Sequence, residues 1–186
     1  MSKDANGGSH KSLLSIREHE LARDLIRQGL RIAAIQSLLQ HVYRTELSRI
    51  WREVFPGESP PAGRLPSGSA SVIKTPLDSA LAAFMLNEYL AIAVEPDLRV
   101  DIEALSAAWE SCQDFLGGRN DYANREIRLE FYNINSLWLL ARDYLAQKVQ
   151  SERCQNCGSR RVRCIDWDIR SKLQRCPHCT LREMGG

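Results

Sequence analysis

Two Cys-x-x-Cys pairs near the C-terminus restrict the structures that this chain can form more than any other feature of its sequence. Cys154 and Cys157 form the first pair, Cys176 and Cys179 form the second, and 18 residues separate the pairs. Two residues between thiols allow one tight turn to aim both sulfurs at the same point, and Gly158 gives the backbone freedom to leave the first turn. This spacing is typical of a zinc ribbon. The sequence therefore predicts one structural Zn²⁺ held by Cys154, Cys157, Cys176 and Cys179.

Two disulfides are the main alternative to a metal site, and a redox-active dithiol is another. The first 20 residues lack the apolar stretch of a secretory signal, which argues against disulfides. No βαβ pattern surrounds either pair, which argues against a thioredoxin-like fold. A site with four cysteine ligands keeps no open position for an activated water, so the metal is expected to be structural. We assign Cys112 to the core, and Cys164 to the core or to a spare thiol.

Residues 161–166, between the two pairs, alternate in polarity as a half-buried strand does. We expect a short strand there, a turn near 167–171 and a return strand into Cys176. His178 is expected in the loop between the second pair of cysteines.

The rest of the chain has the periodicity and the capping signals of α-helices. Ser15 and Glu18 form a capping-box pattern, Asp101 can cap a later helix, and five of the seven prolines lie between residues 56 and 76. We predict a mainly α fold: a flexible leader (1–14), a helical domain (15–150) with a Pro-rich connection (56–76), and a zinc-ribbon module (151–186). The expected helices cover residues 15–28, 31–39, 44–55, 77–94, 101–116 and 125–147.

Residues 31–55 fit a helix-turn-helix-like segment, with Val42 as the apolar residue of the turn. On a helix from residue 44, the side chains of Leu47, Ile50, Trp51 and Val54 fall on one face. Thr45, Arg49 and Arg52 fall together on the other face. Such an outward cluster can contact phosphates or guanine edges in a major groove, although a solvated helix face gives the same pattern.

The charge is distributed unevenly along the chain. Residues 1–57 carry 9 basic and 6 acidic side chains, residues 58–150 carry 8 and 13, and residues 151–186 carry 8 and 4. The two ends therefore suit a polyanion such as DNA, and the middle does not. The arginines and lysine that we expect at phosphates in the C-terminal module are Arg160, Arg161, Arg163, Lys172 and Arg175.

The sequence favours neither an enzyme nor a membrane protein. Its four histidines are scattered, and no GxSxG, P-loop, GxGxxG or HExxH pattern is present. The longest apolar stretch, residues 81–94, has 14 residues, whereas a membrane span needs about 20. We expect a cytoplasmic, non-enzymatic protein.

Three features together resemble one family, the bacterial flagellar transcriptional activator subunit FlhC. Residues 59–66 (SPPAGRLP) resemble that family's S-P-P-x-G-x-L-P segment, residues 47–53 (LSRIWRE) resemble the helix before it, and the four cysteines match its C-terminal zinc site. The resemblance implies a helical protein that forms a hetero-oligomer with FlhD subunits. It also implies binding to promoter DNA upstream of flagellar operons and activation through RNA polymerase.

Two readings of the chain other than a DNA-binding activator subunit stay open at this point. In one, a zinc-stabilised scaffold grips a protein partner and DNA is bound elsewhere. In the other, the protein is a redox-active dithiol protein. One tightly held zinc in the purified protein would exclude this alternative.

Overall fold

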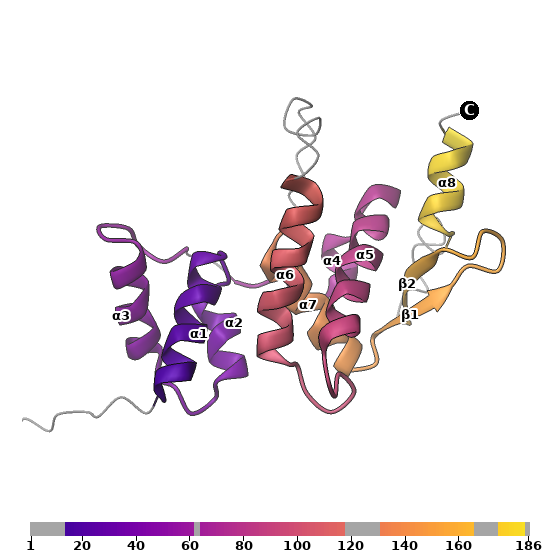
Figure 1. Cartoon of the computed structure of the whole chain (residues 1–186). Helices are drawn as coiled ribbons and strands as arrows, with labels where there is room; N and C mark the ends of the chain where they lie inside the picture. Colours follow the sequence, from indigo (N-terminus) through magenta and orange to yellow (C-terminus); the bar gives the residue numbers. More distant parts are fainter. Residues whose placement is uncertain (1–13, 62–63, 118–130, 166–174, 185–186) are drawn as a thin grey trace, which may run out of the picture.

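The computed structural model describes residues 14–61, 64–117, 131–165 and 175–184. Within these residues the chain is mainly helical, with one two-stranded antiparallel sheet, as the sequence predicted (Figure 1). No helix in the described part is long and apolar enough to cross a membrane. The elements in chain order are α1 (Ile16–Arg27), α2 (Ile32–Leu38), α3 (Arg44–Val54), α4 (Ser69–Val72), α5 (Pro76–Ile92), α6 (Ile102–Gly117), α7 (Ile134–Leu145), β1 (Val149–Arg153), β2 (Arg160–Cys164) and α8 (Pro177–Met184).

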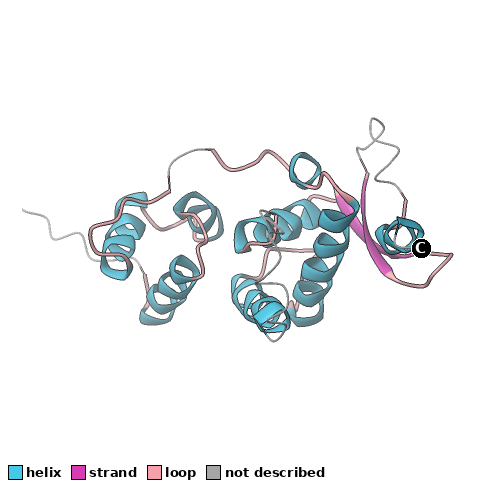
Figure 2. Cartoon of the chain, turned by 90° about the horizontal axis from the view of Figure 1, so that it is seen from above, coloured by secondary structure: helices cyan, strands magenta, loops and turns pink. Residues whose placement is uncertain are grey.

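Helices α1, α2 and α3 form a three-helix cluster at one end of the molecule (Figures 1 and 2). The predicted capping box of α1 is present: the Ser15 hydroxyl accepts the Glu18 N–H at 3.2 Å, and the Glu18 carboxylate accepts the Ser15 N–H at 2.8 Å. Val42 is buried in the turn between α2 and α3, as expected. Of the predicted inward residues of α3, Leu47, Ile50 and Trp51 are buried, and Val54 is partly buried against the core.

Helix α5 is the centre of the rest of the fold. It packs against α6, α7, β2 and α8, and it therefore carries apolar residues around most of its circumference. Asp101 caps α6 as predicted, because its carboxylate accepts the N–H groups of Glu103 and Ala104. The side chains of Tyr89, Leu86 and Leu105 are fully buried between these helices.

The helix predicted over residues 125–147 is wrong at its start. Residues 131–133 are not helical, and α7 begins only at Ile134. Asn133 decides this start, because its side-chain oxygen accepts the Ser136 N–H at 3.0 Å. Residues 118–130 lie outside the described part of the chain.

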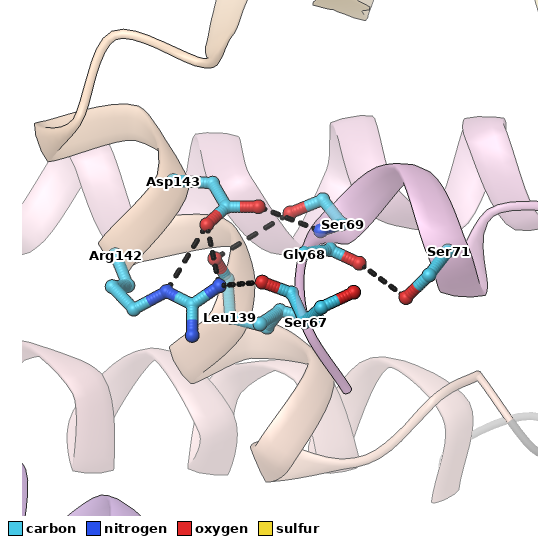
Figure 3. Close-up of polar contacts among 7 residues, drawn as sticks. All are labelled: Ser67, Gly68, Ser69, Ser71, Leu139, Arg142 and Asp143. Atoms are coloured by element: carbon cyan, nitrogen blue, oxygen red, sulfur yellow. Dashed lines mark hydrogen bonds and ion pairs between the residues drawn. The ribbon is translucent and has the colours of Figure 1, made fainter. Parts of the chain in front are cut away.

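The Pro-rich connection contains a four-residue helix, α4, that the sequence analysis missed, and it is held against α7. Asp143 is 2% exposed, and its carboxylate accepts the Ser69 N–H at 2.6 Å. Arg142 bonds the same carboxylate at 2.7 Å and the Ser67 carbonyl at 2.8 Å (Figure 3). Asp143 and Arg142, adjacent residues of α7, thus both bond the backbone at this end of the connection, and Arg142 also neutralises the buried Asp143 carboxylate.

One asparagine joins the three-helix cluster to α7. Asn135 accepts the Arg31 N–H at 3.0 Å and donates to the Gly29 carbonyl at 3.0 Å. It therefore bridges both sides of the turn between α1 and α2, where Gly29 has a φ of +90° that favours glycine.

The sheet pairs β1 with β2, and Arg153 lies opposite Arg160 across the first cysteine turn. The sequence analysis did not predict this pairing; the return strand that it expected before Cys176 falls mostly outside the described residues. Residue 175 is in a bend and α8 follows, so the described residues contain no return strand next to Cys176; residues 166–174 are outside the description. The proposed boundary at residue 150 falls within β1, and the leader (1–14) is described only at Leu14.

Candidate metal centre and nearby arginines

The four cysteines of the two pairs come together at the end of the hairpin. Cys154 directly follows β1, and Cys157 lies in the turn that leads to β2. The turn is closed by the bond from the Gly158 N–H to the Cys154 carbonyl at 2.9 Å, and Gly158 has a φ of +72°. Cys176 directly precedes α8, and Cys179 lies in its first turn. The second pair is therefore positioned by a helix that the sequence analysis did not predict.

The four sulfur atoms have the separation of a tetrahedral metal site. All four lie within 4.8 Å of one another, with 3.9 Å between Cys154 and Cys179 and 3.6 Å between Cys157 and Cys176. Ligands about 2.3 Å from a central ion at tetrahedral angles lie about 3.8 Å apart. A disulfide needs about 2.05 Å. The cluster can therefore hold one metal ion.

Hydrogen bonds and burial shift the pKa values of the four thiols in different directions. The Ser159 hydroxyl and N–H lower the pKa of Cys157 to about 6, and the N–H groups of Cys157 and Asn156 lower the pKa of Cys154. Burial raises the pKa of Cys176, and the hydrogen bond with Cys157 raises that of Cys179. The first turn thus favours thiolates, whereas the second pair needs a cation nearby to ionise.

The predicted basic residues of the C-terminal module differ in their exposure and in whether a carboxylate pairs with them. Arg161 pairs with Glu152 on β1, where the Nη2 to Oε1 distance is 2.5 Å, and its side chain is only 25% exposed. Arg163 reaches the same carboxylate only at 3.8 Å and is 62% exposed. Arg160 bonds Asn87 at 3.4 Å, and Arg175 is exposed without an ion pair in the described part. Lys172 lies outside the described residues.

On α3, the predicted residues Thr45, Arg49 and Arg52 are all exposed. Arg49 is bracketed by Glu46 at 2.6 Å and Glu53 at 2.9 Å, which raise its pKa and neutralise its charge locally. Arg52 bonds only the Ser48 carbonyl among the described groups. Arg44 is also exposed, at the first turn of α3, and the sequence analysis did not single it out.

The model of the flagellar transcriptional activator family FlhC matches residues 9–183, nearly the whole chain. The chain belongs to the FlhC family. Because the match includes both cysteine pairs and the Pro-rich connection, the resemblance seen in the sequence is confirmed. FlhC is a family of transcriptional activators and not a class of enzymes. The comparison with individual curated proteins gives no match.

Two further basic residues at the metal centre were missed. Arg153 follows the sheet into the first cysteine turn and donates to the Gly158 carbonyl at 3.3 Å, and Arg182 lies on α8. A hollow beside the cysteines is lined by both Arg182 and His178. The signal that could have found Arg182 is its three-residue distance from Cys179, which places both on one turn of a helix.

Proposed function

We propose that this FlhC-family chain is a DNA-contacting subunit of a cytoplasmic flagellar activator, assembled with FlhD subunits, and that the complex activates flagellar operons through RNA polymerase. The family match supports the activator function. The observation that carries the DNA contact is the group of exposed arginines on and beside the cysteine-anchored hairpin, Arg160, Arg163 and Arg175. A rigid hairpin loses little conformational entropy when its side chains bind phosphates.

The metal in this proposal is one structural Zn²⁺. Four thiolates are a ligand set that zinc accepts, and the sulfur separations suit its bond length. When bound, the ion would supply the positive charge that the thiols of Cys176 and Cys179 need to ionise and would hold α8 against the hairpin.

Arg160, Arg161, Arg163, Lys172 and Arg175 are proposed to contact phosphates, and Thr45, Arg49 and Arg52 are proposed to contact the groove. Because Glu152 already holds Arg161, we expect the larger phosphate contributions from Arg160, Arg163 and Arg175. Glu46 and Glu53 compete with DNA for Arg49 in the same way, which favours Arg52 as the stronger contact on α3.

The test is a salt titration of promoter binding by the complex of this chain with FlhD. Replacing Arg160, Arg163 and Arg175 by Ala should weaken binding to all DNA sequences alike and should lower the slope of log K against log salt by about one for each lost contact. Arg52→Ala should instead cost about 1–3 kcal/mol on the promoter site alone. Arg99→Ala is the matched control, since Arg99 is exposed on the loop before α6.

A second candidate function is a zinc-stabilised scaffold without direct DNA contact. It is favoured by the carboxylates that engage Arg161 and Arg49, and by the exposed Leu181 and Met184 on α8, which suit a protein partner. Affinities that stay within about twofold of the parent complex for every arginine variant would support the scaffold and exclude the DNA contact.

A further inference from the structure

A cavity of about 440 Å³ lies where the three-helix cluster, the Pro-rich connection and α7 meet. This volume is within the range of small-molecule sites, which often lie at junctions between structural units. Its wall is partly apolar, with Leu65, Phe131 and Leu139 among the lining residues. No cysteine and no residue of α3 lines the cavity, so neither the metal centre nor the proposed DNA contacts use it.

Two cations line this cavity without a carboxylate partner in the described part of the chain. Arg31 uses one guanidinium nitrogen for the Arg64 carbonyl at 3.3 Å, and its other guanidinium nitrogens have no described partner. The Lys74 side chain is exposed and makes no described bond. Asp78 also lines the cavity, but its carboxylate accepts the N–H groups of Lys74 and Thr75, both at 2.9 Å. The free donors therefore exceed the free acceptors.

One hydroxyl in the wall has no hydrogen bond to the described residues. Ser136 is 7% exposed, lines the cavity, and has no hydrogen bond to its hydroxyl among the described residues. A hydroxyl held in this way is ready to bond a ligand. The caps of α5 and α7, Thr75 and Asn133, line the cavity as well, so the positive ends of two helix dipoles lie at its edge.

We propose that this cavity binds a small organic phosphate. Its phosphate group lies between Arg31, Lys74 and the Ser136 hydroxyl, which together supply charge-assisted and neutral hydrogen bonds. Its apolar part lies against Leu65, Phe131 and Leu139. Because Arg31 belongs to the three-helix cluster and Ser136 to α7, the bound ligand would bridge the two and restrain their relative movement.

Phenyl phosphate is a suitable probe, with phenol and inorganic phosphate as its two halves. Saturation-transfer and ³¹P NMR on the complex of the whole 186-residue chain with FlhD should show that phenyl phosphate binds more tightly than either half. Lys74→Ala and Ser136→Ala should each weaken it by about fivefold to tenfold, since each removes one ligand hydrogen bond. Arg99→Ala, at an exposed cation that does not line the cavity, should leave binding unchanged.

Two results would overturn the site. In one, phenol or inorganic phosphate binds as tightly as phenyl phosphate. In the other, Lys74→Ala and Ser136→Ala behave like Arg99→Ala. Leu65→Trp gives an independent check, because its larger side chain lies on the connection and should fill the cavity and block the probe. Thermal unfolding of each variant, compared with the parent, separates lost binding from lost folding.

Discussion

The side chains of Cys154 and Cys157 owe their positions to contacts within a few residues of the chain. The turn bond from Gly158 to Cys154, and the bond from the Cys154 N–H to the Ser159 carbonyl at 2.8 Å, are both local. Cys164, by contrast, lies at the end of β2 with its side chain in the core, and Cys112 is fully buried on α6. The six cysteines therefore divide into four that converge and two that do not.

Cys154→Ser should remove the metal. Zinc content should fall from about one per chain toward zero, and the hairpin with α8 should lose its protection from proteolysis, because metal-binding free energy is also folding free energy in such a site. Metal analysis after dialysis measures this. Cys164→Ser is the control and should keep its zinc. A Cys164→Ser protein without metal, together with a Cys154→Ser protein that retains it, would refute the ligand assignment.

The stability of the chain should depend on Cys112 at alkaline pH. Burial raises the pKa of this thiol from 9.0 to about 11. Between these values the folded chain keeps a proton that the unfolded chain releases. The free energy of unfolding therefore has its full contribution from Cys112 below pH 9, and it should fall as the pH rises toward 11, by at most about 1.4 kcal/mol per pH unit.

Urea unfolding at a series of pH values, compared between the parent and Cys112→Ala, isolates this effect. The pKa of Tyr132 is raised first by burial, which is present in both proteins, and further by Cys112, so the difference in slope reports the Cys112 thiol together with its interaction with Tyr132. Identical slopes for the two proteins would show that the folded state does not hold the Cys112 proton.

Among the elements, the Pro-rich connection has the least secondary structure and depends most on its neighbour α7. Its contacts with Asp143 and Arg142 replace the internal hydrogen bonds that its prolines exclude. An added Cβ at Gly68 would lie 3.3 Å from the Asp143 carboxylate, so a larger residue there would press on the group that holds the connection.

Asp143→Asn should destabilise the chain by about 2 kcal/mol, since it removes a buried charge that Arg142 and the Ser69 N–H both contact. It should also speed tryptic cleavage after Arg64, because the connection is no longer held. Urea unfolding and timed proteolysis measure these two effects. Glu95→Gln is the matched control: it breaks the exposed pair with Arg99, 3.9 Å apart, and should cost less than about 0.5 kcal/mol. Equal effects of both changes would contradict the holding role of Asp143.

The whole molecule has its three-helix cluster at one end and its hairpin and α8 at the other, with α5 between them (Figures 1 and 2). Large apolar side chains remain exposed across this length, among them Ile16, Tyr43, Val94, Leu98 and Met184. A subunit that works in a complex leaves such surface for its partners.

The chain made without FlhD should therefore self-associate. Light scattering after size-exclusion chromatography should show polydisperse particles that become one defined species when FlhD is co-expressed. Two neighbouring substitutions give a useful contrast. Leu98→Asp removes an exposed apolar side chain and should reduce the self-association of the isolated chain more than Arg99→Asp, which replaces a charged one. A stable, monodisperse monomer in the absence of FlhD would contradict the proposed subunit role.

The sequence by itself determined the elements whose signals are local. The capping box of α1, the apolar face of α3 and the spacing of each cysteine pair depend on residues three or four positions apart, and these predictions are confirmed. It could not place the start of α7, because Asn133 caps that helix in the middle of an otherwise helical pattern. It also missed α8, since a Cys-x-x-Cys pair is compatible with a strand or a helix.

Only the tertiary structure decided which residues of distant segments meet. It paired β2 with β1, which no local pattern had predicted, because both pack against α5 and bury Val149 and Val162 there. It paired the Arg161 guanidinium with the Glu152 carboxylate, and it brought Arg31, Lys74 and Ser136 to the wall of one cavity. Local free energies set turns and caps, but the choice among strand pairings and ion pairs depends on apolar area buried between segments tens of residues apart, which no short sequence pattern contains.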